Sequence, residues 1–451
     1  MSQVSSFFGL QTSLRGLLAQ QRMLDTTGHN IANANTAGYT RQQAVLQASP
    51  ALEIAAGGVA SGAPAHLGSG VDVQTFKRVR DGFTDIQYRA QNSLLGNATA
   101  QADALDQAQS ALAEPGEDGI NAQLQAFWDA WSDLSNSPTD PAAKQAVVEQ
   151  AQSLGDAFSA VRSQIGSVAT QTYAKYQDLT SVPNGDIAQA AKEIASLNTT
   201  ISRATVVGDV PNDLLDRRDQ LLDQLSGYGQ ISVTDKGDGS IDVAFMDTQS
   251  AGTSYDIVKG GTVAWTGAPA SWSPGGQLGG LLAAGDPATG TLNSYLTALD
   301  GVAGQLASLV NTATGTSFFT VGTPAAATLQ VTPAILAAPT SLAAGTGGAA
   351  SNDIALKVQA LRGDATVDGA YQAFVARVGS EVRAAERTQT NSQALVDNVA
   401  DRRASISGVA LDEEMTNMIS FQRGYQASAR AMSTMDDLLD VLINRTGRVG
   451  L

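Results

Sequence analysis

Four aspartates and two arginines lie close together near the middle of the chain, and carboxylates so placed could serve acid–base hydrolysis. Their positions are Asp213, Asp216, Asp219 and Asp223, with Arg217 and Arg218 among them. Spacings of three and four place the carboxylates along one helix face, where arginines one to four residues away can pair with them. We therefore expect a solvated, salt-bridged helix face here rather than a pair of catalytic carboxylates.

The acidic, glycine-rich loop from Asp235 to Asp242 has the composition of a calcium-binding loop. An EF-hand, however, places oxygen ligands at alternate positions and closes with a glutamate. Here Gly237, Gly239 and Ile241 occupy the alternate positions after Asp235, and strand-like segments flank the loop. The pattern predicts the turn of a β-hairpin, in which glycine supplies positive φ, and no metal site.

Few other residues could carry catalysis. The chain has 451 residues, no cysteine and two histidines, His29 and His66. This composition excludes disulfide and thiolate chemistry and leaves little for histidine-based acid–base schemes or a transition-metal site. The glycine pairs at 57–58, 275–276 and 279–280 are not followed by the Gly-Lys-Ser/Thr of a phosphate-binding loop. The sequence predicts a protein that is not an enzyme and that binds no cofactor and no metal.

The charge of the chain bears on its partners. The formal net charge is -16 and the pI is about 4.5, which disfavours nucleic acid and anionic membrane as partners. No run of 18 apolar residues predicts a membrane span. The first basic residue is Arg15, so we expect no secretory signal peptide. From the residues alone, the protein would be cytosolic.

The C-terminal segment has the clearest helical periodicity of apolar residues in the chain. Apolar side chains recur there at spacings of three or four, which places them on one stripe of an α-helix. They are Leu411, Met415, Met418, Phe421, Tyr425, Ala429, Met432, Met435, Leu439 and Leu442. Such a helix would be roughly 50 Å long at about 1.5 Å per residue. A helix of this length with one apolar stripe requires a partner of similar length.

A second stripe lies at the other end of the chain. Its members alternate at spacings of four and three, which is a heptad seam. They are Leu10, Leu14, Leu17, Gln21, Leu24, Gly28 and Ile31. Each of these helices could pack on an ordinary core, or the two could pack against each other. We expect the two terminal helices to pack together as a coiled-coil-like end of the molecule.

The segments between these helices predict a mainly α fold with inserted β structure. Helical periodicity covers most of the chain from residue 81 to residue 225 and returns at 288–312 and 352–407. From Gln230 the period changes from 3.6 to 2, which predicts paired hairpins. We expect a terminal helical domain (1–50 with 405–451), an elongated helical bundle (51–227 with 286–313 and 351–404) and a small inserted β domain (228–285 with 314–350).

Five segments carry a family resemblance. Residues 30–42 (NIANANTAGYTRQ) and 409–414 (VALDEE) resemble the signatures of bacterial flagellar axial proteins, the rod, hook and hook-associated family. Three further segments are similar to the family member that joins the hook to the filament, and they occur in the right order. They are 138–146 (PTDPAAKQA), 212–221 (NDLLDRRDQL) and 275–282 (GGQLGGLL).

The resemblance implies a structural subunit of the bacterial flagellum at the junction between hook and filament. Its implied partners are further copies of itself in a ring or tube, the hook protein, a second junction protein with the flagellin filament, and an export chaperone at the C-terminal helix. It also implies type III export without cleavage of a signal peptide, which would place the protein outside the cell. Besides the two stripes, it implies assembly contacts at the turn containing Asn33, Gly38, Tyr39 and Arg41.

Two alternatives remain. A hook or filament-type axial subunit would share the 30–42 signature, but its middle should be mostly β, which the helical 81–225 region disfavours. A secreted hydrolase carried on the flagellum would need a metal or acid–base cluster in the insertion. Residues 228–350 contain no histidine or cysteine and few carboxylates, so the structural role is preferred.

Overall fold

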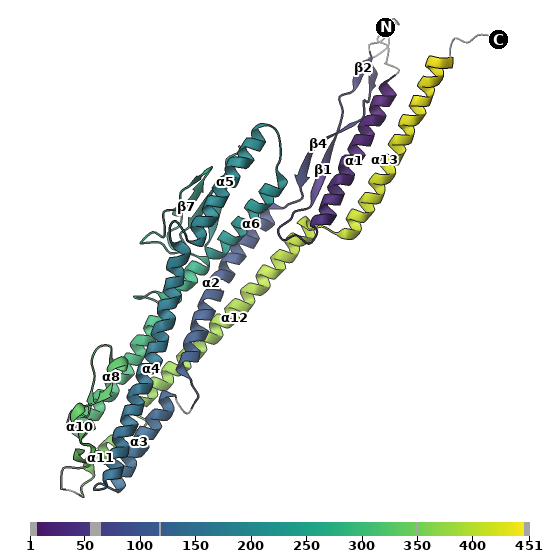
Figure 1. The fold of residues 1–451 in the computed structure, drawn as a ribbon. Coiled ribbons are helices and arrows are strands. Elements are labelled where there is room, and N and C mark those ends of the chain that lie inside the picture. The colour runs from purple at the N-terminus through teal and green to yellow at the C-terminus, as the bar shows by residue number, and fades with distance from the viewer. Residues whose placement is uncertain (1–6, 55–64, 117–118, 349, 446–451) are drawn as a thin grey trace.

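The computed structural model describes residues 7–54, 65–116, 119–348 and 350–445. The molecule is elongated and has two parts that meet at a bend (Figure 1). We call the first part the arm; it contains residues 7–54, 65–78 and 411–445. The second part, the body, contains residues 82–407. The start of the first helix, α1 (Phe8–Asn33), and the end of the last α-helix, α13 (Leu411–Asp440), lie at the end of the arm that points away from the body (Figure 1).

Two antiparallel helices form the arm, α1 (Phe8–Asn33) and α13 (Leu411–Asp440), and a short π-helical turn follows (Val441–Arg445). Their contact is close because small residues lie in it. A Cβ atom added at Gly16 would lie 3.3 Å from Ser428 Oγ, and one added at Gly424 would lie 2.7 Å from Gln20 Cδ. The predicted pairing of the terminal helices is confirmed.

A β-ribbon packs along α1. Strand β1 (Gln42–Ala48) pairs antiparallel with β4 (Val71–Arg78), and β2 (Leu52–Ile54) pairs with β3 (Ala65–Leu67). Arg15 on α1 donates from Nη1 to the carbonyl oxygen and the hydroxyl of Ser69, each at 3.1 Å, and so ties the helix to the loop before β4.

Long helices build the body, and α2 lies alongside α12 (Figure 1). The bounds of the main helices are α2 (Gly82–Leu112), α3 (Ile120–Asn136), α4 (Pro141–Thr180), α5 (Asp186–Val206), α6 (Asn212–Tyr228), α7 (Gly276–Gly285), α8 (Thr291–Thr314), α11 (Asp353–Gln359) and α12 (Asp368–Ser407). Local signals set their starts. Asp81 accepts from the backbone N–H groups of Phe83 and Thr84, and Asp140 with Pro141 begins α4.

The main core of the body is aromatic. Phe127, Trp128 and Trp131 of α3 are fully buried with Phe318 and Phe319. The ring centroids of Phe127 and Trp128 lie 4.9 Å apart, within the range of favourable aromatic pairs. This cluster ties α3 to the segment after α8 and makes the distal half of the body a closed, packed unit.

A four-stranded antiparallel sheet packs on α5 beside the upper body. Its strands follow chain order: β5 (Ile231–Asp235), β6 (Ile241–Met246), β7 (Ser254–Lys259) and β8 (Thr262–Val263). In the β5–β6 turn, Asp235 Oδ1 accepts from Gly237 N at 2.8 Å and Asp238 Oδ1 accepts from Ser240 N at 2.8 Å. These carboxylates stabilise the turn of a hairpin, as the sequence predicts.

One segment expected in the β domain is helical. Residues 276–285 form α7, which packs against α2. A Cβ atom at Gly280 would lie 2.4 Å from the carbonyl oxygen of Asn97, so only glycine allows this approach. Close tertiary packing therefore outweighs the low helix propensity of glycine here.

A second segment lies away from the four-stranded sheet. Residues 314–350 pack on α4 and α8 at the distal end of the body and bury Phe318, Phe319 and Val331 in its core. Their short elements are β9 (Phe319–Thr320), α9 (Ala325–Thr328), β10 (Gln330–Val331), α10 (Pro333–Ala337) and a 3-10 turn (Pro339–Ser341). Three large apolar side chains explain the location, because the aromatic core offers them more burial than a sheet edge does.

Candidate assembly interface

The predicted stripe residues of the arm are only partly covered. Leu14 is 43% exposed, Leu411 49%, Met415 57%, Tyr425 36% and Met435 39%. Gln21 is exposed as well. The other side chains of the two stripes that the structure describes are half-buried: Leu10, Leu17, Leu24, Ile31, Met418, Phe421, Ala429, Met432 and Leu439. The side chain of Leu442 lies outside the described part. Within α13, the described residue that is buried is Glu414.

Helix α1 turns a different face to α13. Its buried residues are Ala19, Met23, Thr27 and Asn30, and Gly9 and Gly16 also touch α13. The leucines of the 4-3 seam therefore lie beside this contact, not in its centre. Small residues allow the two backbones to approach, and the larger apolar side chains remain toward the surface.

Sequence reasoning missed several exposed apolar residues of the arm. They are Leu18 at 46%, Ile419 at 49%, Leu438 at 59%, Val441 at 45% and Ile443 at 65%. Leu18 and Ile419 each lie four residues after a predicted member, so the helical spacing could have identified them. Together with the stripes, they give the arm an apolar surface that its own chain does not cover.

Asn30 connects three segments at the base of the arm and is 1% exposed. Its Nδ2 donates to the carbonyl oxygen of Gln42 at 2.9 Å and to Glu414 Oε2 at 3.1 Å. Its Oδ1 accepts from Gln42 N at 2.9 Å and from the Tyr39 hydroxyl at 2.7 Å. All four hydrogen-bonding positions of the amide are used, so Asn30 fixes α1 against β1 and the start of α13.

Tyr39 and His29 form a second polar contact beside Asn30. Burial, with the negative charges of Asp213, Asp216 and Glu414, raises the pKa of the Tyr39 hydroxyl far above its usual value. Tyr39 therefore stays protonated and donates to Asn30. Because that proton is used, His29 Nδ1 supplies the proton of its own 2.9 Å contact with the Tyr39 oxygen.

The remaining turn residues also have structural partners. Arg41 donates from Nε to Glu414 Oε1 at 2.7 Å and from Nη1 to Glu413 Oε2 at 3.0 Å. Asn33 donates from Nδ2 to the carbonyl oxygen of His29 at 3.0 Å and closes α1. Gly38 has φ +76° and lies against the Gln220 side chain of α6. These residues position the arm, and their polar groups are largely occupied within the chain.

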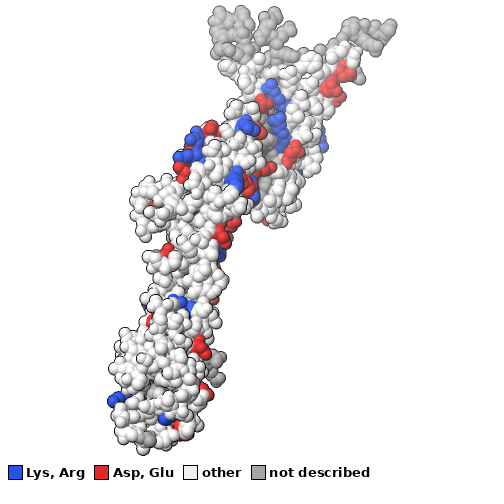
Figure 2. Space-filling model, turned by 60° about the vertical axis from the view of Figure 1, so that its left-hand side comes forward, with Lys and Arg blue, Asp and Glu red and all other residues white. Residues whose placement is uncertain are grey.

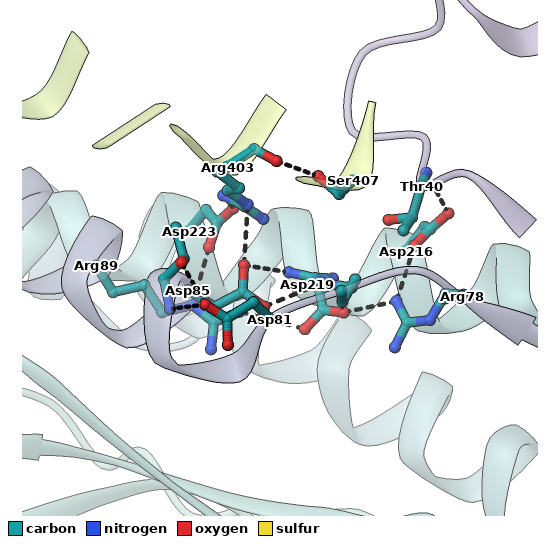
Figure 3. Close-up of polar contacts among 12 residues, drawn as sticks. Thr40, Arg78, Asp81, Asp85, Arg89, Asp216, Asp219, Asp223, Arg403 and Ser407 are labelled. Carbon is teal, nitrogen blue, oxygen red and sulfur yellow. Dashed lines mark hydrogen bonds and ion pairs between the residues drawn. The ribbon is translucent and has the colours of Figure 1, made fainter. Parts of the chain in front are cut away.

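An ion-pair cluster fills the bend between arm and body (Figure 3). Asp216, Asp219 and Asp223 project from α6 toward arginines that come from other segments. Asp216 Oδ1 lies 2.8 Å from Arg78 Nη1, and its Oδ2 accepts from the backbone N–H of Thr40 at 2.9 Å. This carboxylate therefore touches both the end of β4 and the turn before β1.

Asp219 holds three arginines. Its Oδ2 lies 2.7 Å from Arg78 Nη1 and also contacts Arg80 Nη1, and its Oδ1 lies 3.2 Å from Arg89 Nη2. Burial alone would raise the pKa of this carboxyl, but the positive charges of Arg80, Arg78 and Arg89 outweigh that effect and hold the pKa below its usual value. Asp219 is therefore ionised at neutral pH.

Arg403 of α12 completes the cluster. Its Nη1 lies 2.6 Å from Asp223 Oδ2, its Nε lies 2.9 Å from Asp85 Oδ1, and its guanidinium lies 5.0 Å from the ring centroid of Tyr88. Arg89 Nε pairs with Asp223 Oδ1 at 2.9 Å, and Arg80 Nη2 with Asp85 Oδ1 at 2.8 Å. We call the eight residues the bend cluster: Arg78, Arg80, Arg89, Arg403, Asp85, Asp216, Asp219 and Asp223.

The expectation of a solvated helix face at 213–223 is therefore wrong for three of its four carboxylates. The side chains of Asp216, Asp219 and Asp223 are 8%, 17% and 18% exposed, and their partners lie 130 to 180 positions away in the chain. The neighbouring Arg217 pairs with Glu193 at the surface, and Arg218 donates to the Gly239 carbonyl oxygen. Long-range packing of α6 against α2, β4 and α12 buries the acidic face.

The described residues contain no group of three or more histidine, cysteine or acidic side chains arranged to hold a metal ion. In the same part of the chain, no helix is both long and apolar enough to span a membrane. On the face shown in Figure 2, charged side chains of both signs gather over the arm and upper body, whereas the lower body is largely uncharged.

Comparisons with known proteins agree with this architecture. Residues 105–326 match a model described as the flagellar hook-associated protein FlgK helical domain. Residues 402–445 match the flagellar basal body rod FlgEFG protein C-terminal model, and residues 10–40 match the flagella basal body rod protein model. The terminal matches define the class, an axial structural protein of the bacterial flagellum.

Curated relatives narrow that class. Flagellar hook-associated protein 1 of Bacillus subtilis is 32% identical over 98% of this chain and 99% of its own length. The Escherichia coli protein of the same name is 26% identical over 96% of this chain and 99% of its own. The chain belongs to the flagellar hook-associated protein 1 family. The predictions of a flagellar structural protein, and of a protein that is not an enzyme, are confirmed.

Among solved structures, the flagellar hook junction protein FlgK from Burkholderia pseudomallei is similar with a TM-score of 0.44 and 22% identity, over 52% of this chain and 47% of that one.

Proposed function

We propose how this chain performs the family's structural role at the junction between hook and filament. Its arm enters a tubular or ring-shaped homo-oligomer and forms the inner wall with the arms of neighbouring copies. Its body lies outward. The observation that carries this proposal is the uncovered apolar surface on both arm helices, which includes Leu14, Met415 and Ile419.

The energetics favour burial of that surface between copies. Fully burying a leucine or methionine side chain is worth roughly 1.5–3 kcal/mol relative to leaving it exposed. Contiguous exposed apolar surface of this kind is typical of interaction sites. Neighbouring arms offer the same apolar surface in repetition, so each added subunit buries what the free subunit leaves exposed.

The hook protein would contact the assembly on one side, and a second junction protein with the flagellin filament on the other. This assignment rests on the family relationship. The mixed charges over the arm and upper body, seen in Figure 2, are suited to polar contacts at the rim of such interfaces.

Complementation of a deletion strain tests the role. Cells without the chain should secrete filament subunits into the medium instead of polymerising them, and the intact chain should restore filaments. Leu17→Asp or Leu24→Asp would place a charge in the proposed contact between copies, so these variants should be exported but should not restore filaments. Gln107→Asp, at an exposed position of α2, serves as the control. Normal filaments with both leucine variants would overturn the proposal.

The C-terminal helix also has features suited to an export partner. Four of the chain's seven methionines, Met415, Met418, Met432 and Met435, lie on α13. Methionine is flexible and polarizable, so it packs against more than one surface. Before assembly, a small helical chaperone would cover this face by helix-in-groove contacts. Export would follow without cleavage of a signal peptide.

Calorimetry with peptides tests the chaperone contact. A 405–451 peptide should bind the chaperone, and a 1–40 peptide should not. Binding by the N-terminal peptide alone would contradict the assignment. In the full chain, Met418→Ser, Phe421→Ser and Tyr425→Ser together should abolish both chaperone binding and filament attachment, and loss of only one would indicate two separate surfaces.

A further inference from the structure

The chain passes between arm and body at two places. Residues 79–81 connect β4 to α2, and residues 408–410 connect α12 to α13 (Figure 1). Arg78 comes directly before the first crossing and Arg80 lies within it, and Arg403 lies near the end of α12, before the second. All three belong to the bend cluster, so each crossing is bound through its side chains to α2 or α6.

Helix α6 is the common partner of both crossings. Asp216 and Asp219 bind the arginines of the first crossing, and Asp223, one turn further on, binds Arg403 of the second. Spacings of three and four align the three carboxylates along α6. One rigid helix therefore sets the relative position of two chain segments that enter the arm from different directions.

Charge balance makes the arrangement specific. The bend cluster contains four arginines and four aspartates, and their side chains are 8% to 22% exposed. Buried ionic groups must be paired to be tolerated. If the arm moved relative to α6, several of these charges would lose their partners at once, so the cluster penalises every other arm direction.

Asp219 has a place in the cluster that the other carboxylates do not share. Among the described residues of the cluster, it is the carboxylate that contacts both Arg78 and Arg80, and it also binds Arg89 of α2. It thus joins the last residue of the arm, the connecting segment and the first helix of the body at one group. Its loss would leave three guanidinium groups without their common acceptor.

We propose that Asp219 is the positioning residue of the arm: through Arg78, Arg80 and Arg89 it fixes the direction in which the arm leaves the body before any neighbouring subunit binds. The inference rests on the proposed function in one respect: a fixed arm direction helps assembly only if the arms of neighbouring copies must align in a tube. The fixed direction itself is a property of the free subunit.

Distance measurements between spin labels test this directly. Because the chain has no cysteine, single cysteines at Ser420 on α13 and Gln107 on α2, both exposed, would carry the two labels. The parent should give one narrow distance distribution. It should keep that distribution at about 1 M salt, where exposed charges are screened within about 3 Å but buried pairs are screened much less. A broad parent distribution would overturn the inference.

The variant Asp219→Asn should lose the single narrow distribution while the helical signal of the body is retained. Asp209→Asn removes the same charge from the exposed loop before α6 and should leave the distribution narrow. A merely stabilising role for Asp219 would lower the melting temperature without broadening the distances, and that result would refute a positioning role.

Arg78→Gln provides a second variant if Asp219→Asn does not fold, because it removes an arm-side donor and leaves the carboxylates of α6 in place. It should broaden the distribution as well, and a narrow one would overturn the inference. Failure of the proposed function is recognised separately, because Leu17→Asp and Leu24→Asp subunits would then both still restore filaments. A narrow distribution for Asp219→Asn with normal filaments would reject only the role of Asp219.

Discussion

Trp128 and Trp131 in the body are fully buried, whereas Met415 and Leu14 in the arm are 57% and 43% exposed. Both regions consist mainly of long helices with apolar stripes, so the difference does not come from helical patterning. It comes from the number of partners: α3 is enclosed by α4, α11 and the segment after α8, whereas α1 has α13 and a two-stranded ribbon. The body has a closed core, whereas the arm leaves apolar side chains uncovered.

The largest expected effect is in the body. Phe127→Ala removes a fully buried ring between Trp128, Trp131, Phe318 and Phe319, and such truncations cost about 3–5 kcal/mol. Urea unfolding followed by tryptophan fluorescence measures it, since all four tryptophans lie in the body. Phe83→Ala, where the ring is 60% exposed, should stay within about 0.5 kcal/mol of the parent. Equal losses of unfolding free energy in the two variants would contradict the contrast between a closed core and an exposed surface.

A smaller effect is expected at the base of the arm. Asn30→Ala removes the side-chain partner of the Gln42 backbone groups and of Glu414 Oε2, which costs about 1–3 kcal/mol. Because the loss is confined to the arm, hydrogen exchange should accelerate in α1 and α13 and stay unchanged in α3 and α4. Asn35→Ala, at an exposed position, should change neither. Faster exchange throughout the body would mean that arm and body unfold as one unit.

Acid should loosen the bend before it affects the aromatic core. The pKa of Asp219 is lowered in the folded chain, so its contribution is present above the ordinary aspartate pKa of about 3.9 and is lost as the pH falls through the lower folded value. The groups that face Asp219 are the guanidinium groups of Arg78, Arg80 and Arg89. The spin-label distances should stay constant from pH 7 to about pH 4 and broaden below. Broadening near pH 6 would point to another group.

The smallest expected effect on the free subunit is at the arm surface. Leu14→Asp should change its unfolding free energy by no more than about 0.5 kcal/mol, because the side chain is already 43% exposed. The same change at the buried Leu124 of α3 should unfold the body. If Leu14→Asp strongly lowered the unfolding free energy of the monomer, the arm would already bury this side chain without a neighbouring copy.

Much of the fold could be predicted from the sequence, because helical periodicity is a local signal. Helix α4 (Pro141–Thr180) lies within the region 81–225 where periodicity predicts helix, and the hairpins after Gln230 lie where the change of period places them. Helix α7 was not predictable in this way. Its 10 residues include several glycines, which disfavour a helix in isolation. The helix is stabilised by close packing on α2, and that packing requires a glycine at position 280.

The bend cluster shows where the sequence signal ends. Spacing reveals that Asp216, Asp219 and Asp223 share a face of α6, but it does not reveal what covers that face. Arg78, Arg80 and Arg403 are far away in the chain, and no local pattern marks them as its partners. On α1, likewise, the periodicity identifies an apolar helix. The residues that meet α13 include Gly9 and Gly16, which have no apolar side chain that could predict which side of α1 touches it.

The double connection between arm and body has a mechanical consequence. Two modules joined by one linker can swivel about it, so a torque on one is not passed to the other. Here two connections, 79–81 and 408–410, run in opposite directions, and the arginines beside both are bound to α6. A twist of the arm therefore stretches one connection against the other and turns the body with it. The subunit is therefore torsionally stiff, and a torque applied to the arm is transmitted to the body.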